Sequence, residues 1–232
     1  MEGFEQKKKY QKQSDSKSRE ADKDFSDGAV NTKSKSRIHC LSIIGQIEGH
    51  YFLPEGQKAT KYEQLIPELV DIEEDDEIEG LLIILNTMGG DVEAGMAIAE
   101  MIASMKKPSV SLVLGGGHSI GVPLATAAKK SFIVSSATMT LHPVRVNGVV
   151  LGAPQTFNYF EEMQKRIVNF ICAHSSSTPD IIRELMMRPD ELATDIGSII
   201  EGREAVEYGI IDAVGGLSDA LAALKEMSLT KV

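Results

Sequence analysis

Apolar residues along 38–232 form short continuous runs that alternate with stripes at helical spacing. The run Leu81–Leu85 is typical of a strand covered on both faces, whereas apolar residues between Val92 and Met105 recur on one helical face. The alternation of strand, turn and helix predicts an α/β domain with mainly parallel strands. We expect strands at 38–45, 81–85, 109–114, 132–134, 139–141 and 210–214, and helices at 62–72, 92–105, 120–128, 155–173, 179–187, 204–208 and 218–227.

Two glycine-rich junctions each join a predicted strand to a helix. Residues 86–90 follow one strand and residues 115–117 follow the next, and we expect both segments to be tight turns. Adjacent turns in a parallel sheet can direct two sets of backbone N–H groups at one point. The N–H groups of Gly90 and Ile120 are therefore candidate oxyanion donors, although a plain tight turn explains the first junction equally well.

A candidate nucleophile follows the second junction. The segment Gly117-His118-Ser119-Ile120-Gly121 matches G-x-S-x-G between a strand and a helix. Only small residues leave room around a hydroxyl in so tight a turn, and a helix N-terminus directs N–H groups at a developing anion. In the alternative interpretation, Ser119 only caps the helix.

A serine nucleophile needs a base, and the candidates are the five histidines His39, His50, His118, His142 and His174. His142 ends the predicted strand 139–141, at the carboxyl edge where sites of open α/β sheets gather. His118 adjoins Ser119 but leaves from the neighbouring face of the turn. His174 ends a long helix, where a cation suits the helix dipole. His142 is therefore the preferred base.

Composition separates a polar tail from this body. Residues 1–37 contain ten Lys or Arg and seven Asp or Glu but few large apolar residues, so burial would not offset their ordering entropy. We expect a disordered tail at 1–37, with a docking arm as the alternative, and one domain at 38–232.

Charge and cysteine content narrow the classes of function. The net charge of −10 argues against nucleic acid as a partner. Cys40 and Cys172 form neither a disulfide framework nor a zinc motif, which favours a reducing cytoplasm. No apolar run approaches the roughly 18 residues of a membrane span, and the charged N-terminus does not resemble a signal peptide.

The sequence resembles the proteolytic subunits of the Clp protease family (ClpP) over residues 38–215. The matching segments agree in order and spacing; they are 43–47, 86–90 with Ala94-Gly95, His118–Gly121, Thr140–Pro143 and Glu204–Asp212. The resemblance implies the ClpP/crotonase fold of stacked β-β-α units and a cytoplasmic serine peptidase without cofactor or metal. It also implies self-assembly into stacked, heptameric rings that take peptides or unfolded proteins.

The resemblance assigns roles to the candidate residues. It implies Ser119 as nucleophile, His142 as general base, and the N–H groups of Gly90 and Ile120 as oxyanion donors. It further implies that residues 146–173 form a protruding strand-plus-helix handle through which the rings stack. The apolar stripe on the handle helix agrees with such a contact, although the helix packing on its own core is the alternative; the stripe is Phe157, Phe160, Met163, Ile167 and Phe170.

The sequence departs from the family pattern at two places. Ungapped alignment puts the triad aspartate on Gly197, so we favour Asp195, on the turn entering a strand-like segment, over Asp190, with no acid as a third possibility. In addition, Gly115–Gly117 and His118 replace the small non-glycine residues that often precede the family's serine. A looser turn there would misplace the hydroxyl.

Three functions remain open at this point. The preferred one is a Ser-His-Asp peptidase working through an acyl-enzyme, which assists translocation of pre-secretory proteins as one branch of the family does. The second is a catalytically degenerate accessory of protein secretion, and the third is a crotonase-like acyl-CoA enzyme, against which Ser119 and His142 argue. The family also implies an unfoldase or the secretion machinery as a partner.

Overall fold

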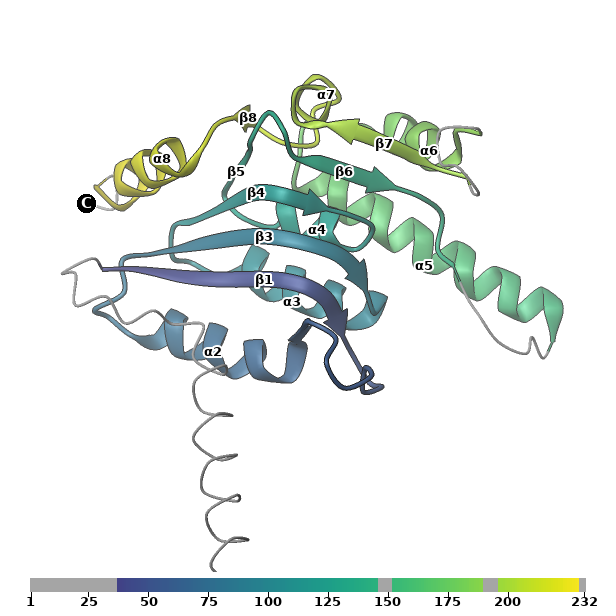
Figure 1. Cartoon of the computed structure of the whole chain (residues 1–232), viewed down its shortest axis with the longest axis horizontal. Helices are drawn as coiled ribbons and strands as arrows, with labels where there is room; N and C mark the ends of the chain where they lie inside the picture. The colour runs from purple at the N-terminus through teal and green to yellow at the C-terminus, as the bar shows by residue number, and fades with distance from the viewer. Residues whose placement is uncertain (1–36, 146–151, 190–195, 230–232) are drawn as a thin grey trace, which may run out of the picture. The chain divides into compact units, whose positions relative to one another are not determined.

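The computed structural model describes residues 37–145, 152–189 and 196–229 (Figure 1). The expected tail up to residue 36, the first six residues of the expected handle, and both Asp190 and Asp195 lie outside the described residues. In chain order the elements are β1 (Ile38–Glu48), β2 (Ala59–Lys61), α2 (Tyr62–Glu74), β3 (Gly80–Gly90), α3 (Val92–Ser104), β4 (Ser109–Gly117), α4 (Gly121–Thr126), β5 (Lys130–Ile133), β6 (Thr138–Leu141), α5 (Ala153–Ala173), α6 (Pro179–Met187), β7 (Ser198–Glu201), α7 (Gly202–Glu207), β8 (Ala213–Val214) and α8 (Leu217–Leu229).

The strands form one mostly parallel sheet. Its order is β2-β1-β3-β4-β5-β8, and every pair along that path is parallel. Strand β6 joins the end of β4 and pairs antiparallel with β7 (Figure 1). The α/β class predicted from the sequence is confirmed, and the sheet agrees with the fold that the resemblance implies.

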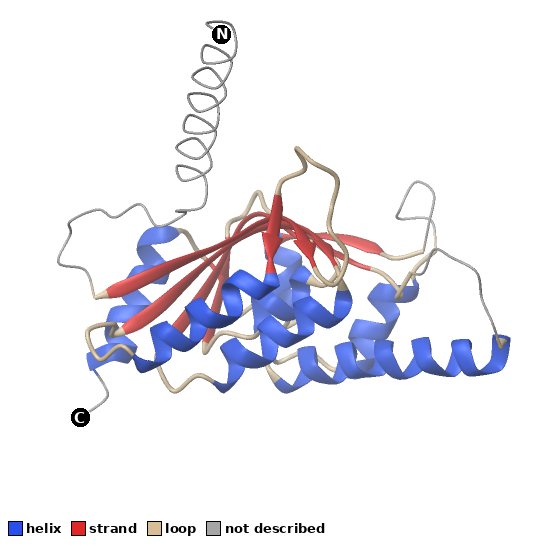
Figure 2. Cartoon of the chain, turned by 90° about the horizontal axis from the view of Figure 1, so that it is seen from below, coloured by secondary structure: helices blue, strands red, loops and turns tan. Residues whose placement is uncertain are grey.

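The two faces of the sheet are buried differently. Leu81, Ile83 and Leu85 belong to the main core, which helices α2 to α6 also line, whereas the alternate residue Leu82 packs with Leu224 of α8 in a smaller cluster. Figure 2 shows most helices gathered on one side of the sheet. Because successive side chains of a strand point to opposite faces, an uninterrupted apolar run is what burial on both faces requires.

The glycine-rich junctions are strand ends and not turns, which corrects the expectation from the sequence. Strand β3 continues to Gly90, which is in register with Ile47 of β1, and β4 continues to Gly117. A Cβ on Gly90 would lie 2.3 Å from the Ile47 carbonyl oxygen. Glycine is needed here because two backbones approach closely, not because the chain reverses.

Two strand predictions were also wrong. The apolar, β-branched segment 38–45 predicts a buried strand, but β1 is buried on one face only, since buried Leu41 and Ile43 alternate with exposed Cys40, Ser42 and Ile44. The strand expected at 210–214 shortens to β8 (Ala213–Val214). Apolar content alone does not show whether a strand lacks cover on its second face.

Candidate active site

Ser119 occupies a strained elbow between β4 and α4. It has a φ of 56°, and among the described residues it is the one non-glycine with positive φ. Such a conformation costs about 1–3 kcal/mol and persists only where the surroundings impose it. The residue that caps α4 is Ile120, without a side-chain cap hydrogen bond. The arrangement therefore favours the elbow over the alternative in which Ser119 merely caps the helix.

Backbone contacts hold this elbow from two strands. The Ser119 N–H donates to the Thr140 carbonyl at 2.8 Å, and the His118 N–H donates to the Thr87 carbonyl at 3.1 Å. Thr87 in turn uses its hydroxyl to accept from the Gly89 N–H at 3.1 Å. The ends of β3, β4 and β6 are thus linked around the serine.

Gly89 lies directly against the serine. Its φ is 90°, and a Cβ built on it would be 2.7 Å from the Ser119 Cβ and 3.3 Å from the hydroxyl oxygen. A side chain at this position would therefore collide with the hydroxyl-bearing atom. Gly89 therefore leaves room for Ser119, and the neighbouring Gly90 lines the same pocket as the serine.

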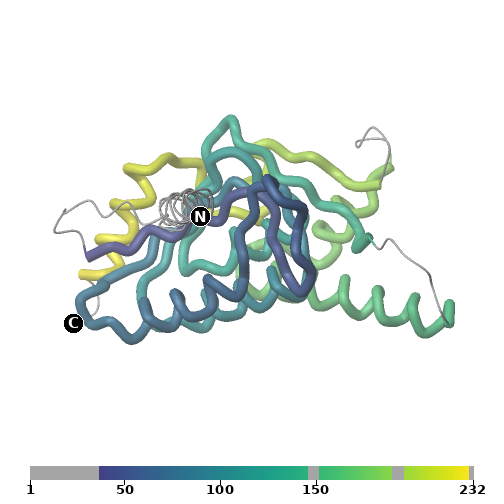
Figure 3. Tube along the Cα trace, turned by 60° about the horizontal axis from the view of Figure 1, so that its bottom comes forward, coloured from purple at the N-terminus to yellow at the C-terminus, as the bar shows by residue number. Residues whose placement is uncertain are grey.

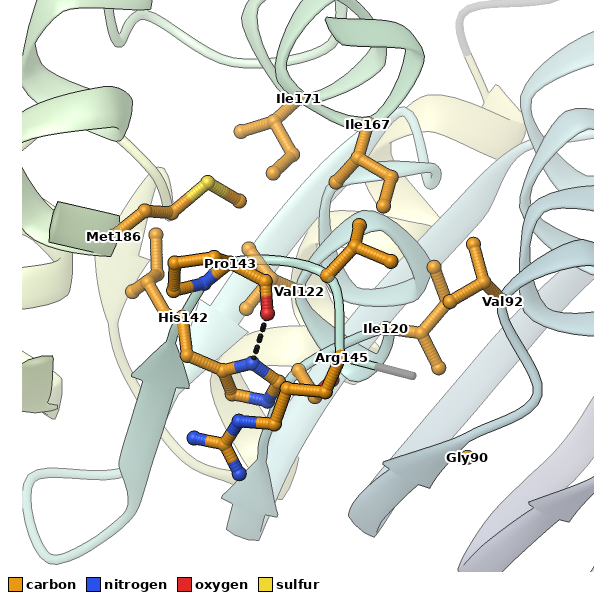
Figure 4. Close-up of a pocket in the computed structure, with 13 residues that line it drawn as sticks. Gly90, Val92, Ile120, Val122, His142, Pro143, Arg145, Ile167, Ile171 and Met186 are labelled. Atoms are coloured by element: carbon orange, nitrogen blue, oxygen red, sulfur yellow. Dashed lines mark hydrogen bonds between the residues drawn. The ribbon is translucent and has the colours of Figure 1, made fainter. Parts of the chain in front are cut away.

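His142 follows β6 and has an assigned tautomer. Its Nδ1 lies 2.7 Å from the Pro143 carbonyl oxygen (Figure 4). A carbonyl only accepts, so Nδ1 carries a proton, and in the neutral ring Nε2 then holds the lone pair. Nε2 is therefore the nitrogen able to take a proton from a nucleophile.

One pocket brings four of the five expected site residues together. Ser119, His142, Gly90 and Ile120 all line a cavity of about 120 Å³, whereas Asp195 lies outside the described residues. Much of the remaining wall is apolar (Figure 4); it includes Val92, Val122, Leu141, Val144, Ile167, Ile171 and Met186. Ile167 and Ile171 come from α5 and Met186 comes from α6. Such a wall suits an apolar side chain beside a polar reacting group.

Comparison with known proteins identifies the family. The Clp protease model matches residues 34–217. The chain is 56% identical over 198 residues to the translocation-enhancing protein TepA of Halalkalibacterium halodurans, covering 85% of this chain and 77% of that protein. It is 26% identical over 215 residues to "Putative protease MJ0651" of Methanocaldococcus jannaschii, covering 78% of this chain and 66% of that protein. The chain belongs to the Clp protease family.

Membership of the Clp protease family suggests a peptidase, and the family usually forms oligomeric rings. None of the helices in the described part of the chain is long and apolar enough to cross a membrane.

The other histidines of this Clp family member have separate surroundings. The His118 ring contacts Thr140 through Nδ1 at 2.8 Å and is not among the residues that line the pocket. Partial burial lowers the pKa of His118, because removal from water disfavours the charged ring. His174 is the C-cap of α5, as predicted, and its Nδ1 contacts the Phe170 carbonyl at 2.9 Å. His39 pairs with Glu68 at 3.0 Å.

Arg145 is a pocket residue that the sequence analysis did not identify. It lines the same cavity as His142 (Figure 4), and its side chain is exposed. The sequence shows only that Arg145 follows the proposed base by three residues. A single arginine in a loop is usually a solvated surface residue, so the sequence alone does not identify it as a pocket residue.

Proposed function

We propose that the chain is a serine peptidase that cleaves peptide bonds through an acyl-enzyme. Ser119 Oγ attacks the peptide carbonyl carbon while His142 Nε2 takes the hydroxyl proton. The C–N bond then breaks and the proton passes to the leaving amine. Water hydrolyses the acyl-serine with His142 again as base, which releases a carboxylic acid and restores the hydroxyl.

The observation that carries this proposal is the convergence of Ser119 and His142 on one pocket. The serine is in a strained left-handed conformation, and the histidine has Nδ1 occupied by a carbonyl, which leaves Nε2 as the base. Strained backbone concentrates at functional sites, and a purely structural serine would have no reason to retain it. The N–H groups of Gly90 and Ile120 are the proposed oxyanion donors, because both residues line the same pocket.

Asp195 is the proposed acid of the triad, with Asp190 as the less favoured candidate. An aspartate at this place would accept the Nδ1–H of His142 and hold the imidazole in one tautomer. The Pro143 carbonyl accepts from the same nitrogen at 2.7 Å. The proposed acid and this carbonyl therefore compete for one N–H. The alternative is a Ser–His dyad oriented by the carbonyl, and mutation of the aspartates distinguishes the dyad from the triad.

Labelling with a fluorophosphonate tests the proposal, because the reagent bonds covalently to an activated serine. We expect the wild-type protein to be labelled, and Ser119→Ala to be unlabelled and without peptidase activity. His142→Gln should reduce labelling strongly while the serine remains. Folding should be unchanged in the alanine variant, since a small hydroxyl contributes little packing. Undiminished labelling of Ser119→Ala would put the nucleophile elsewhere.

Assistance to protein translocation is a second proposal, supported by the 56% identity to a protein named for enhancing translocation. A catalytically degenerate accessory would perform this role without Ser119. Export of a secreted reporter should therefore be measured in cells that carry either the wild-type gene or Ser119→Ala. Equal export with an unlabelled wild-type protein favours the accessory; loss of export in the variant favours peptidase action.

A further inference from the structure

Residues 115–118, which differ from the family pattern, form a close contact between a glycine and a histidine ring. The His118 ring lies over the backbone of Gly116, where a Cβ would be 2.5 Å from Nε2. Gly116 and His118 therefore fit together: the absence of a side chain at Gly116 makes room for an imidazole before the serine. The strand end is not looser for its glycines, because the His118 ring occupies the space beside Gly116 and Asn86 occupies the space beside Gly115.

The same ring contacts the strand that carries the base. His118 Nδ1 and the Thr140 hydroxyl are 2.8 Å apart, and Thr140 also accepts the Ser119 N–H through its carbonyl at 2.8 Å. Thr140 thus holds both residues of the elbow, one through its side chain and one through its backbone. It lies two residues before His142 and is the last but one residue of β6.

We propose that the His118–Thr140 hydrogen bond is a positioning device that holds Ser119 in its left-handed conformation and at a set place relative to His142. The expected effect on the acylation rate rests on the proposed peptidase function. The expected effect on the Ser119 conformation does not depend on that function. His118 is a positioning residue and not a catalytic one, because its ring contacts Thr140 and Gly116 and does not line the pocket.

Thr140→Val removes the hydroxyl and keeps the branched shape, and Thr140→Ser restores the hydroxyl. The half-buried site should tolerate both. Thr138→Val, two residues earlier on the same face of β6, is the matched control. We expect Thr140→Val to slow fluorophosphonate acylation by about 10–100-fold, as small misplacements of reacting groups do. Thr140→Ser and Thr138→Val should stay near the wild-type rate.

His118→Leu removes the ring nitrogen, whereas His118→Asn keeps an amide near the Nδ1 position. The leucine variant should match Thr140→Val, and the asparagine variant should recover part of the rate. In a peptide assay the loss should fall on kcat with KM unchanged, because the pocket wall is untouched. The double variant His118→Leu with Thr140→Val should be no slower than either single one, since both remove one interaction. Additive losses, or wild-type rates in the single variants, would overturn the proposal.

A crystal structure of Thr140→Val compared with that of the wild type provides a readout independent of activity. We expect Ser119 to leave the left-handed region in the variant; a retained positive φ would refute the positioning role. If the wild-type protein is not labelled at all, the peptidase function fails, and this comparison still decides whether the pair holds the elbow.

Discussion

At the scale of single residues, the identity of the triad acid is the prediction that most needs a test, because the sequence offers two aspartates. Asp195→Asn should slow acylation by about 10⁴-fold if this aspartate controls the His142 tautomer. The sequence favours Asp190 as the N-cap of a short helix, and asparagine caps about as well as aspartate, so Asp190→Asn, the matched control, should change acylation and stability little. Stopped-flow acylation and thermal unfolding measure the two effects. The reverse pattern would mean that Asp190 is the acid, and no effect from either variant would indicate a Ser–His dyad without a triad acid.

The burial of His118 should make the stability of the folded chain depend on pH. Burial lowers its pKa from the ordinary 6.5, so the unfolded chain binds a proton more readily than the folded one. Its contribution to stability is present above the ordinary pKa and is lost as the pH falls from there toward the lowered pKa. Free energies of unfolding in urea, measured between about pH 7.5 and 5, should therefore fall less for His118→Asn than for the wild type. An identical pH dependence of the wild type and His118→Asn would show that burial does not lower the pKa of His118.

At the scale of elements, the end of β3 is predicted to support the elbow by steric fit. Gly89→Ala would force a Cβ to within 2.7 Å of the Ser119 Cβ and should lower acylation by about 100-fold. Gly56→Ala is the control, because its φ of 87° matches the 90° of Gly89 while nothing lies within 4 Å of its Cβ. Both variants carry a similar backbone strain, about 1–2 kcal/mol, so thermal unfolding should report it in each. Equal acylation rates would contradict the steric role.

Helix α5 divides into two halves with different surroundings. Met163, Ile167 and Phe170 are buried against the chain's own core, whereas Phe157 is 67% exposed and Tyr159 is 55% exposed. Figure 3 shows the N-terminal end of this helix extending away from the neighbouring elements. The two interpretations of the apolar stripe therefore apply to different segments: the second half is core, and only the first half is available for a handle contact.

At the scale of the whole molecule, we expect the exposed half of α5 to hold an oligomer together. Phe157→Glu would put a charge into an apolar contact that symmetry repeats at every copy, and light scattering should show a smaller assembly. Asn158→Glu, at the next exposed position, adds the same charge without removing an aromatic ring. Unchanged mass in Phe157→Glu, or equal effects of both variants, would show that this surface is not the contact.

Most strands and helices, the serine junction and the histidine at a strand end followed from the sequence, whereas the short strands β2 and β7 were not among the expected strands. Strand and helix periods of apolar residues are local properties, and the motifs around Ser119 and His142 are short enough to be read without knowing what packs on them. Both residues line one pocket with Gly90 and Ile120, and their catalytic roles stay predictions.

Tertiary structure decided what depends on segments far apart in the chain. The glycine junctions are strand ends: Gly90 lies too close to the backbone of β1 for a side chain, and Gly116 lies too close to the His118 ring. The link between His118 and Thr140 spans 22 residues of sequence, and the division of α5 depends on which of its turns lie on the core. Close approach, long-range hydrogen bonds and burial arise only when distant segments meet, so no local pattern of residues specifies them.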